Sequence, residues 1–92
     1  MDANVMHGIW QQEQRSRKYR FVNLVPRDHS KEYKVLVTEL EFPIEDGMPT
    51  DVRGATAVES SDWFSTIDRA EDEAMLTYQR HIDQGWRDMA SE

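Results

Sequence analysis

Residues 15–21 (RSRKYRF) concentrate positive charge and aromatic rings in one short run. Cations of this kind contact phosphates while a neighbouring ring stacks on a base. The candidate contact residues for a nucleic acid or an acidic partner are Arg15, Arg17, Lys18, Tyr19 and Arg20. We favour a structural role over nucleic-acid contact, because basic residues on a strand edge deter aggregation and would neutralise an acidic helix. With a sequence pI of about 4.9, we expect any nucleic-acid contact to be local and supported by a protein partner.

A second candidate surface is acidic and lies in residues 65–85. On a helical wheel, one apolar residue projects among acids on the side that faces away from the apolar stripe. The partner-binding set is Asp68, Asp72, Glu73, Leu76 and Asp83. Carboxylates along a rigid helix can imitate a row of phosphates and occupy a cationic groove, and an exposed leucine beside them resembles an interface anchor. The alternative is an ordinary solvated face.

The remaining reactive residues give little support for catalysis. The three histidines, His7, His29 and His81, fall in different segments without the spacing of a metal site. We expect His81 to be partly exposed. Glu71 lies within the apolar side of the wheel, where burial would raise the pKa of its carboxyl group, although pairing with a sheet arginine such as Arg20 is the simpler expectation. Nucleophile and phosphate-loop motifs are missing, so we expect no enzyme, no metal and no cofactor.

The strongest secondary-structure signal spans residues 65–85. Ser65 and Asp68 resemble a capping box, acidic residues crowd the amino-terminal end, and Gly85 suits a left-handed C-cap. The wheel places an apolar stripe on one side, with Met75 and Trp86 at its margin. The residues of the stripe are Trp63, Ile67, Ala70, Ala74, Tyr78, His81 and Ile82. This pattern predicts a main helix, within residues 62–86, that packs on another layer.

Strand signals occupy residues 19–59. Residues 19–25 and 33–42 are rich in β-branched and aromatic side chains and predict an antiparallel hairpin. Residues 43–50 contain two prolines and a glycine and predict a loop, and residues 51–59 predict a weaker third strand with a bulge at Gly54. Residues 4–14 show helical spacing broken by Gly8, which predicts a short amino-terminal helix or a flexible arm, within residues 1–17, that docks through Ile9 and Trp10.

The predicted fold is a single α+β domain of 92 residues, with a three-stranded antiparallel sheet packed on one long C-terminal helix. The chain has no cysteine, no apolar run long enough for a membrane span and no secretory signal pattern, so we expect a cytoplasmic protein. Its charge is uneven. Residues 1–34 carry seven Lys or Arg and four acids, a net +3, whereas residues 35–92 carry four Arg and fourteen acids, a net −10.

In overall format the chain resembles the small phage-encoded anti-CRISPR proteins: short, acidic, free of cysteine and of catalytic motifs, with a few strands on one helix and a local cationic patch. The resemblance implies an inhibitor that binds an RNA-guided surveillance complex and blocks its access to DNA. The strand order is also similar to the HicB-like antitoxin core. We therefore expect a non-enzymatic inhibitor or interaction protein, a monomer or homodimer, that binds a larger protein or ribonucleoprotein complex. A small nucleic-acid-binding module or an antitoxin component is the alternative.

Overall fold

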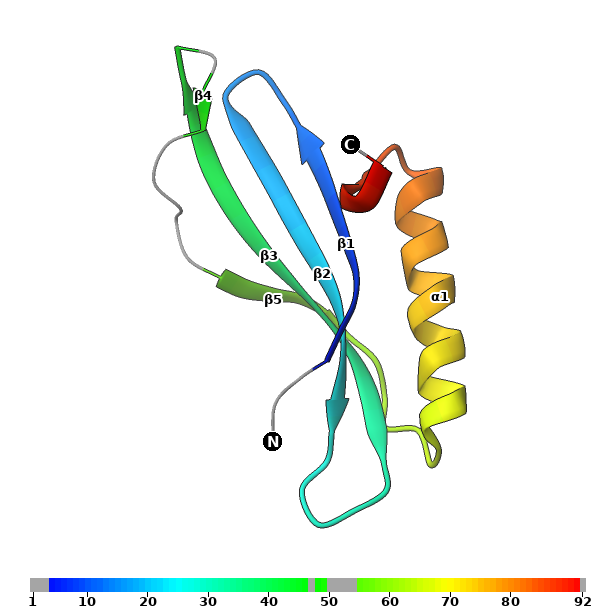
Figure 1. The fold of residues 1–92 in the computed structure, drawn as a ribbon. Coiled ribbons are helices and arrows are strands. Elements are labelled where there is room, and N and C mark those ends of the chain that lie inside the picture. The colour runs from blue at the N-terminus through cyan, green and yellow to red at the C-terminus, as the bar shows by residue number, and fades with distance from the viewer. Residues whose placement is uncertain (1–3, 47, 50–54, 92) are drawn as a thin grey trace.

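The computed structural model describes residues 4–46, 48–49 and 55–91. Within them, an antiparallel sheet carries a single α-helix on one side (Figure 1). The elements in chain order are β1 (Asn4–Gln12), β2 (Ser16–Pro26), β3 (Tyr33–Glu45), β4 (Met48–Pro49), β5 (Ala55–Ser60), α1 (Ile67–Asp83), β6 (Arg87–Asp88) and a 3₁₀ turn, η1 (Met89–Ser91). The predicted α+β class is confirmed, whereas the prediction of only three strands is wrong.

The error lies mainly at the amino terminus, where residues 4–12 form strand β1 instead of a helix. β1 pairs antiparallel with β2 from Asn4↔Leu24 to Gln12↔Arg17. Ile9, one of the two docking residues expected of an arm, is completely buried. Because Gly8 weakens a helix and Ile9 and Trp10 favour strands, pairing with β2 decides the conformation of this segment.

The predicted hairpin of the second and third strands is confirmed, with β2 paired antiparallel to β3. β3 runs three residues further than expected, through Pro43 to Glu45, and pairs there with the two-residue strand β4 inside the predicted loop. β5 borders the same edge of β3 and includes the end of the predicted third strand. The predicted bulge at Gly54 lies outside the described residues, while β5 itself shifts register between its partners Val37 and Thr38.

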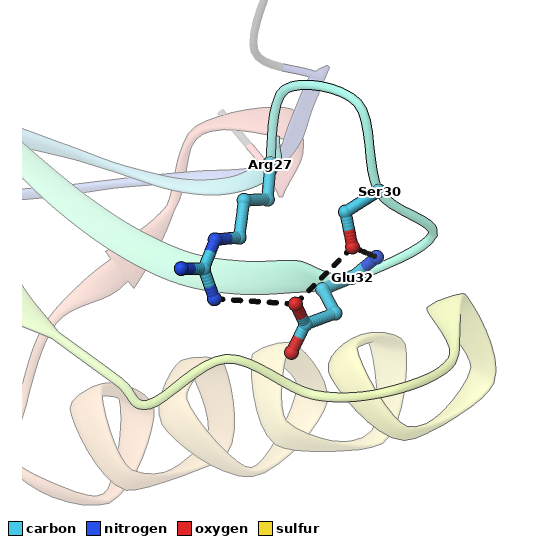
Figure 2. Close-up of polar contacts among 3 residues, drawn as sticks. All are labelled: Arg27, Ser30 and Glu32. Atoms are coloured by element: carbon cyan, nitrogen blue, oxygen red, sulfur yellow. Dashed lines mark hydrogen bonds and ion pairs between the residues drawn. The ribbon is translucent and has the colours of Figure 1, made fainter.

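The turn between β2 and β3 is held by a small polar network (Figure 2). Glu32 accepts hydrogen bonds from the Arg27 guanidinium at 3.2 Å and from the Ser30 hydroxyl at 3.1 Å. The same hydroxyl accepts from the Glu32 backbone N–H at 3.1 Å, and His29 supplies the left-handed residue with a φ of 59°. Local polar contacts therefore hold the loop of the predicted hairpin.

Both ends of α1 are capped by local interactions. Thr66 rather than Ser65 is the N-cap, and its hydroxyl accepts from the Arg69 N–H at 3.3 Å. At the other end the N–H of Trp86 donates to the carbonyl of His81, and the N–H of Gly85 donates to that of Ile82, which together form a Schellman motif. Gly85 has the left-handed φ of 101° that this motif requires, so its predicted role is confirmed.

The core lies between α1 and one face of the sheet. Its central cluster is Val22, Leu24, Val35, Val37, Ala70 and Ala74. Ala70, Ala74 and His81 of the predicted stripe are buried, whereas Ile67 of the stripe is 40 % exposed and Thr77, which was not assigned to it, is buried. Trp63, assigned to the helical stripe, lies before the helix begins and is half-buried. Small side chains at Ala70 and Ala74 let the helix approach the valines of β2 and β3 closely.

The chain after α1 is fastened to the sheet edge by Tyr78 and Asp88. The Tyr78 hydroxyl donates to the Asp88 carboxylate, and the His7 ring of β1 stacks on Tyr78 with centroids 4.3 Å apart. This hydrogen bond raises the pKa of Tyr78 and is the main reason that the pKa of Asp88 is lowered. The bond therefore links the end of α1 to β6, which pairs with β1.

Replacing Tyr78 by phenylalanine should destabilise the fold near neutral pH. The difference in stability between wild type and variant should be smaller in acid. Because the folded-state pKa of Asp88 is lowered, its contribution is present above the unfolded-state value of about 3.9 and is lost as the pH falls below it. Because the pKa of Tyr78 is raised, its contribution is lost only as the pH rises above about 10. Thermal unfolding midpoints of wild type and variant, measured across this range, should converge at the acid end. Tyr33→Phe is the control, and a constant difference at every pH would contradict the assignment.

Candidate functional site

The alternation of β2 splits the predicted basic run between the two faces of the sheet. Arg20 shares the α1 side of the sheet with Val22 and Leu24, which are core residues. Arg17 and Tyr19 lie on the opposite side, at alternate positions of the same strand. Arg15 lies in the turn before β2 and is exposed, and its carbonyl accepts from the Ile44 N–H. The five predicted contact residues therefore do not share one surface.

Arg20 belongs to a structural cluster beneath the helix. Its Nε donates to Glu39 Oε1 at 2.9 Å, its Nη1 donates to His81 Nε2 at 3.0 Å, and its guanidinium lies 4.5 Å from the centre of the Trp86 ring. His81 is only 3 % exposed, contrary to the sequence prediction, and its Nδ1 bonds to the Thr77 carbonyl at 2.8 Å. Arg20 thus has its partners within the fold, so it holds the helix to the sheet.

The side of the sheet away from α1, here called the open face, has no covering α-helix among the described residues (Figure 1), although the Met89 side chain of η1 reaches it beside Gly8. Cross-strand pairing aligns its side chains in rows. The rows are Gln12, Arg17, Phe42; Arg87, Trp10, Tyr19, Leu40, Ala55; Gly8, Phe21, Thr38, Ala57; Val5, Asn23, Leu36, Ser60; and Val25, Lys34. These positions of the described strands include three cations, Arg17, Lys34 and Arg87, and no carboxylate. The open face is therefore apolar and locally positive although the chain carries a net charge of −7.

A ladder of alternating arginines and aromatic rings crosses one end of the open face. We define this aromatic–arginine ladder as Arg87, Trp10, Arg17, Tyr19 and Phe42. The guanidinium carbons of Arg87 and Arg17 lie 5.3 and 5.1 Å from the centre of the Trp10 ring. Arg17 also donates to the Tyr19 hydroxyl at 3.2 Å. The rings of Tyr19 and Phe42 pack edge to face with their centres 5.5 Å apart. The ladder combines cations and rings from four strands.

Among the described residues, the two arginines of the ladder have no acidic partner. The ion pairs among the described residues join Arg20 to Glu39, Arg27 to Glu32 and Arg80 to Glu59, and none includes Arg17 or Arg87. Arg17 donates its Nε to the neutral Gln12 side chain at 2.7 Å. Two guanidinium groups around one indole ring, with no ion pair to a carboxylate among the described residues, create a positive potential that favours an anionic ligand.

A second cation–ring contact lies where the open face meets the turn before α1. Lys34, an open-face residue, has its ammonium 4.9 Å from the centre of the Trp63 ring. The guanidinium carbon of Arg27 lies 5.3 Å from the centre of the same ring. Arg27 is already paired with Glu32, as Figure 2 shows, whereas Lys34 has no ion pair among the described residues. Cations are thus present at both ends of the apolar rows.

The predicted acidic set divides unequally on α1. Asp68, Asp72 and Asp83 are exposed, and Leu76 is 65 % exposed beside them. Glu73 instead is half-buried, and lines a small pocket with Val35 and Val37 of β3 and with Thr77. We call Asp68, Asp72, Leu76 and Asp83 the outer helix face. It lies on the opposite side of the molecule from the ladder.

Glu71 and His81, two ionisable residues of α1, do not come together as an acid–base pair. Glu71 is exposed on α1, whereas His81 is buried against the sheet. The two lie ten residues apart on the helix, and neither lines the pocket beside Trp10 or the pocket beside Glu73. Glu71 also does not pair with Arg20, which bonds to Glu39 instead.

Comparisons of the chain with protein-family models, with curated proteins and with solved structures gave no match. Within residues 4–46, 48–49 and 55–91, no group of three or more His, Asp or Glu residues is placed to hold a metal ion. No helix in this part of the chain has the length and apolar character needed to cross a membrane.

Three members of the ladder, Trp10, Phe42 and Arg87, were missed as site residues in the sequence. Trp10 was assigned to a helix or arm, so its alignment with Tyr19 could not be predicted. Phe42 carried a usable signal, because it alternates with Leu40 in a clear strand pattern. Arg87 carried no usable signal in the sequence, since its position beside Trp10 depends on the pairing of β6 with the edge of β1.

Proposed function

We propose that the chain is a non-enzymatic binding protein that holds single-stranded nucleic acid on the open face of its sheet. The observation that carries the proposal is the aromatic–arginine ladder, whose two arginines have no acidic partner among the described residues. Guanidinium groups bind phosphates in a bidentate manner, and aromatic rings stack on unpaired bases. The occupant is chosen by charge complementarity, because the open-face positions of the described strands offer cations but no carboxylates.

The geometry favours a single strand over a duplex. Bases in a duplex are stacked on one another, so side-chain rings on a broad sheet surface have no access to them. In a single strand each base offers a free face to Tyr19 or Phe42, while its phosphates reach Arg17 and Arg87. The acidic outer helix face lies away from this surface and limits long-range attraction. We therefore expect local binding, as within a nucleoprotein complex, and not a coat along long strands.

A labelled RNA or DNA strand of about 12 nucleotides, titrated at low salt and followed by fluorescence anisotropy, tests the proposal. Wild type should bind the single strand and bind the matching duplex more weakly. Tyr19→Leu, which keeps an apolar side chain but removes the ring, should weaken single-strand binding about tenfold, since stacking contributes about 1–3 kcal/mol per base. Its thermal midpoint should change little because Tyr19 is half-buried on the uncovered side.

Either of two results would argue against this function. Equal affinity of wild type and Tyr19→Leu would exclude the ladder as the contact surface. Failure of wild type to bind either strand would leave an acidic protein segment or a second copy of the chain as the occupant, and sedimentation of the free protein would separate these two.

A second candidate is the inhibitor role expected from the anti-CRISPR-like format, in which the outer helix face docks into a basic groove of a larger complex. The observation that favours it is Leu76, which is 65 % exposed among Asp72 and Asp83. The neighbouring Met75 is also 52 % exposed. The two candidates use opposite sides of the molecule, so locating the contacted residues distinguishes them.

A further inference from the structure

A pocket of about 460 Å³ lies beside the Trp10 end of the ladder. It is formed where the last residues of β1 separate from the segment that leads from α1 into β6. The lining residues are Trp10, Gln11, Gln12, Glu13, Gly85 and Arg87. Its volume falls within the range of about 300–1,000 Å³ that is usual for small-molecule sites, so the pocket has room for one nucleotide rather than a folded partner.

The pocket is rich in hydrogen-bond donors that the fold does not use. The Trp10 Nε1–H is shielded from solvent and has no hydrogen-bond partner among the described residues, so the fold leaves this donor unsatisfied. Gln12 uses its carbonyl oxygen to accept from Arg17, which leaves its amide N–H groups as donors. Arg87 adds a guanidinium without an ion pair among the described residues. Glu13 is the one acidic member.

We propose that this pocket binds the phosphorylated end of a nucleic-acid strand, a terminal nucleotide that carries a phosphate monoester. The inference rests on the proposed function, because the rest of the strand would continue across the open face. A terminal monoester carries about 1.5–2 negative charges near neutral pH, whereas an internal diester carries about one. Arg87 therefore gains most from a terminal phosphate, and Gln12 supplies a further donor.

The other members of the pocket suit the remainder of the nucleotide. Glu13 accepts hydrogen bonds only, so it fits a sugar hydroxyl or a base amino group and repels the phosphate. The space beside Gly85 is open, since a methyl group built at this position would meet no atom of a more distant residue within 4 Å.

The test compares three forms of one single strand: with a 5′-phosphate, with a 3′-phosphate and with hydroxyl groups at both ends. One phosphorylated form should bind wild type about tenfold more tightly than the hydroxyl form, as expected for charge-assisted bidentate bonds. In Arg87→Gln this ratio should fall to about one, even if all three strands bind more weakly. The ratio should also fall at about pH 5, below the second phosphate pKa of about 6.

Glu13→Gln is the matched variant, because it removes the acidic group from the same pocket and should raise the preference for a phosphorylated end. Thermal midpoints of both variants verify that they fold. Equal binding of the three strands by wild type would overturn the terminal site and leave the open-face function intact. A preference that persists unchanged in Arg87→Gln would also overturn it. Binding of none of the strands would overturn both proposals.

Discussion

Replacing Ile9 by alanine should lower the free energy of unfolding by about 2–5 kcal/mol, the usual cost of removing a fully buried aliphatic side chain. Ile9 is 0 % exposed and lies in β1, with Arg20 of β2 on one side and Asp88 of β6 on the other. Few large side chains of the chain are fully buried, so other apolar contacts compensate little for the loss of the Ile9 side chain. Urea unfolding followed by circular dichroism measures the change.

Val5→Ala is the control for Ile9→Ala, since Val5 belongs to the same strand but is 59 % exposed. It should change the free energy of unfolding by no more than about 0.5 kcal/mol. A small effect of both substitutions would contradict the fold, because it would mean that residues 4–12 form a detachable arm. The pair therefore decides between the strand in the structure and the arm that the sequence also allowed.

Arg20→Ala and Arg17→Ala should have opposite consequences although they remove the same charge from one strand. Arg20→Ala leaves the Glu39 carboxylate and His81 Nε2 without the donor they share, and should cost about 1–3 kcal/mol of stability. The side chains of Arg20 and Glu39 are 24 % and 16 % exposed, so the cost stays below the roughly 3–5 kcal/mol of a fully buried pair.

Arg17→Ala should change stability little, because Arg17 has no ion pair among the described residues and lies on the uncovered side of the sheet. It should instead weaken single-strand binding and reduce the salt dependence of that binding by about one ion. Urea unfolding and anisotropy at several salt concentrations measure the two effects. If Arg17→Ala were the more destabilising variant, the assignment of the two faces would be wrong.

The sequence predicted α1 well because its signals are local. Acids in the first turns, an apolar stripe and Gly85 act within a few residues, and the structure moved the N-cap by only one position, from Ser65 to Thr66. The prediction for residues 4–12 was wrong for the opposite reason, because the interactions that decide their conformation are not local. Val5, Met6, Ile9 and Trp10 fit a helical spacing, and only pairing with β2 and the complete burial of Ile9 select the strand.

The site was harder to predict than the fold because its residues come together only through strand register. Residues 15–20 form one basic patch in the sequence, yet a strand sends Arg17 and Arg20 to opposite faces. Trp10 and Arg87 are adjacent because β6 returns to the edge of β1, which no local pattern indicates. Tyr19 was identified in the sequence, but its partners in the ladder were not all recognised.

The most direct test of the open-face proposal is to map the contacted residues by nuclear magnetic resonance, using isotope-labelled protein and an unlabelled single strand. The amide and side-chain signals that move should belong to the open face, above all the indole N–H of Trp10 and the amides around Arg17, Tyr19 and Phe42. Signals from the outer helix face should stay in place. Shifts confined to Asp72, Leu76 and Asp83, with the ladder unchanged, would contradict the proposal.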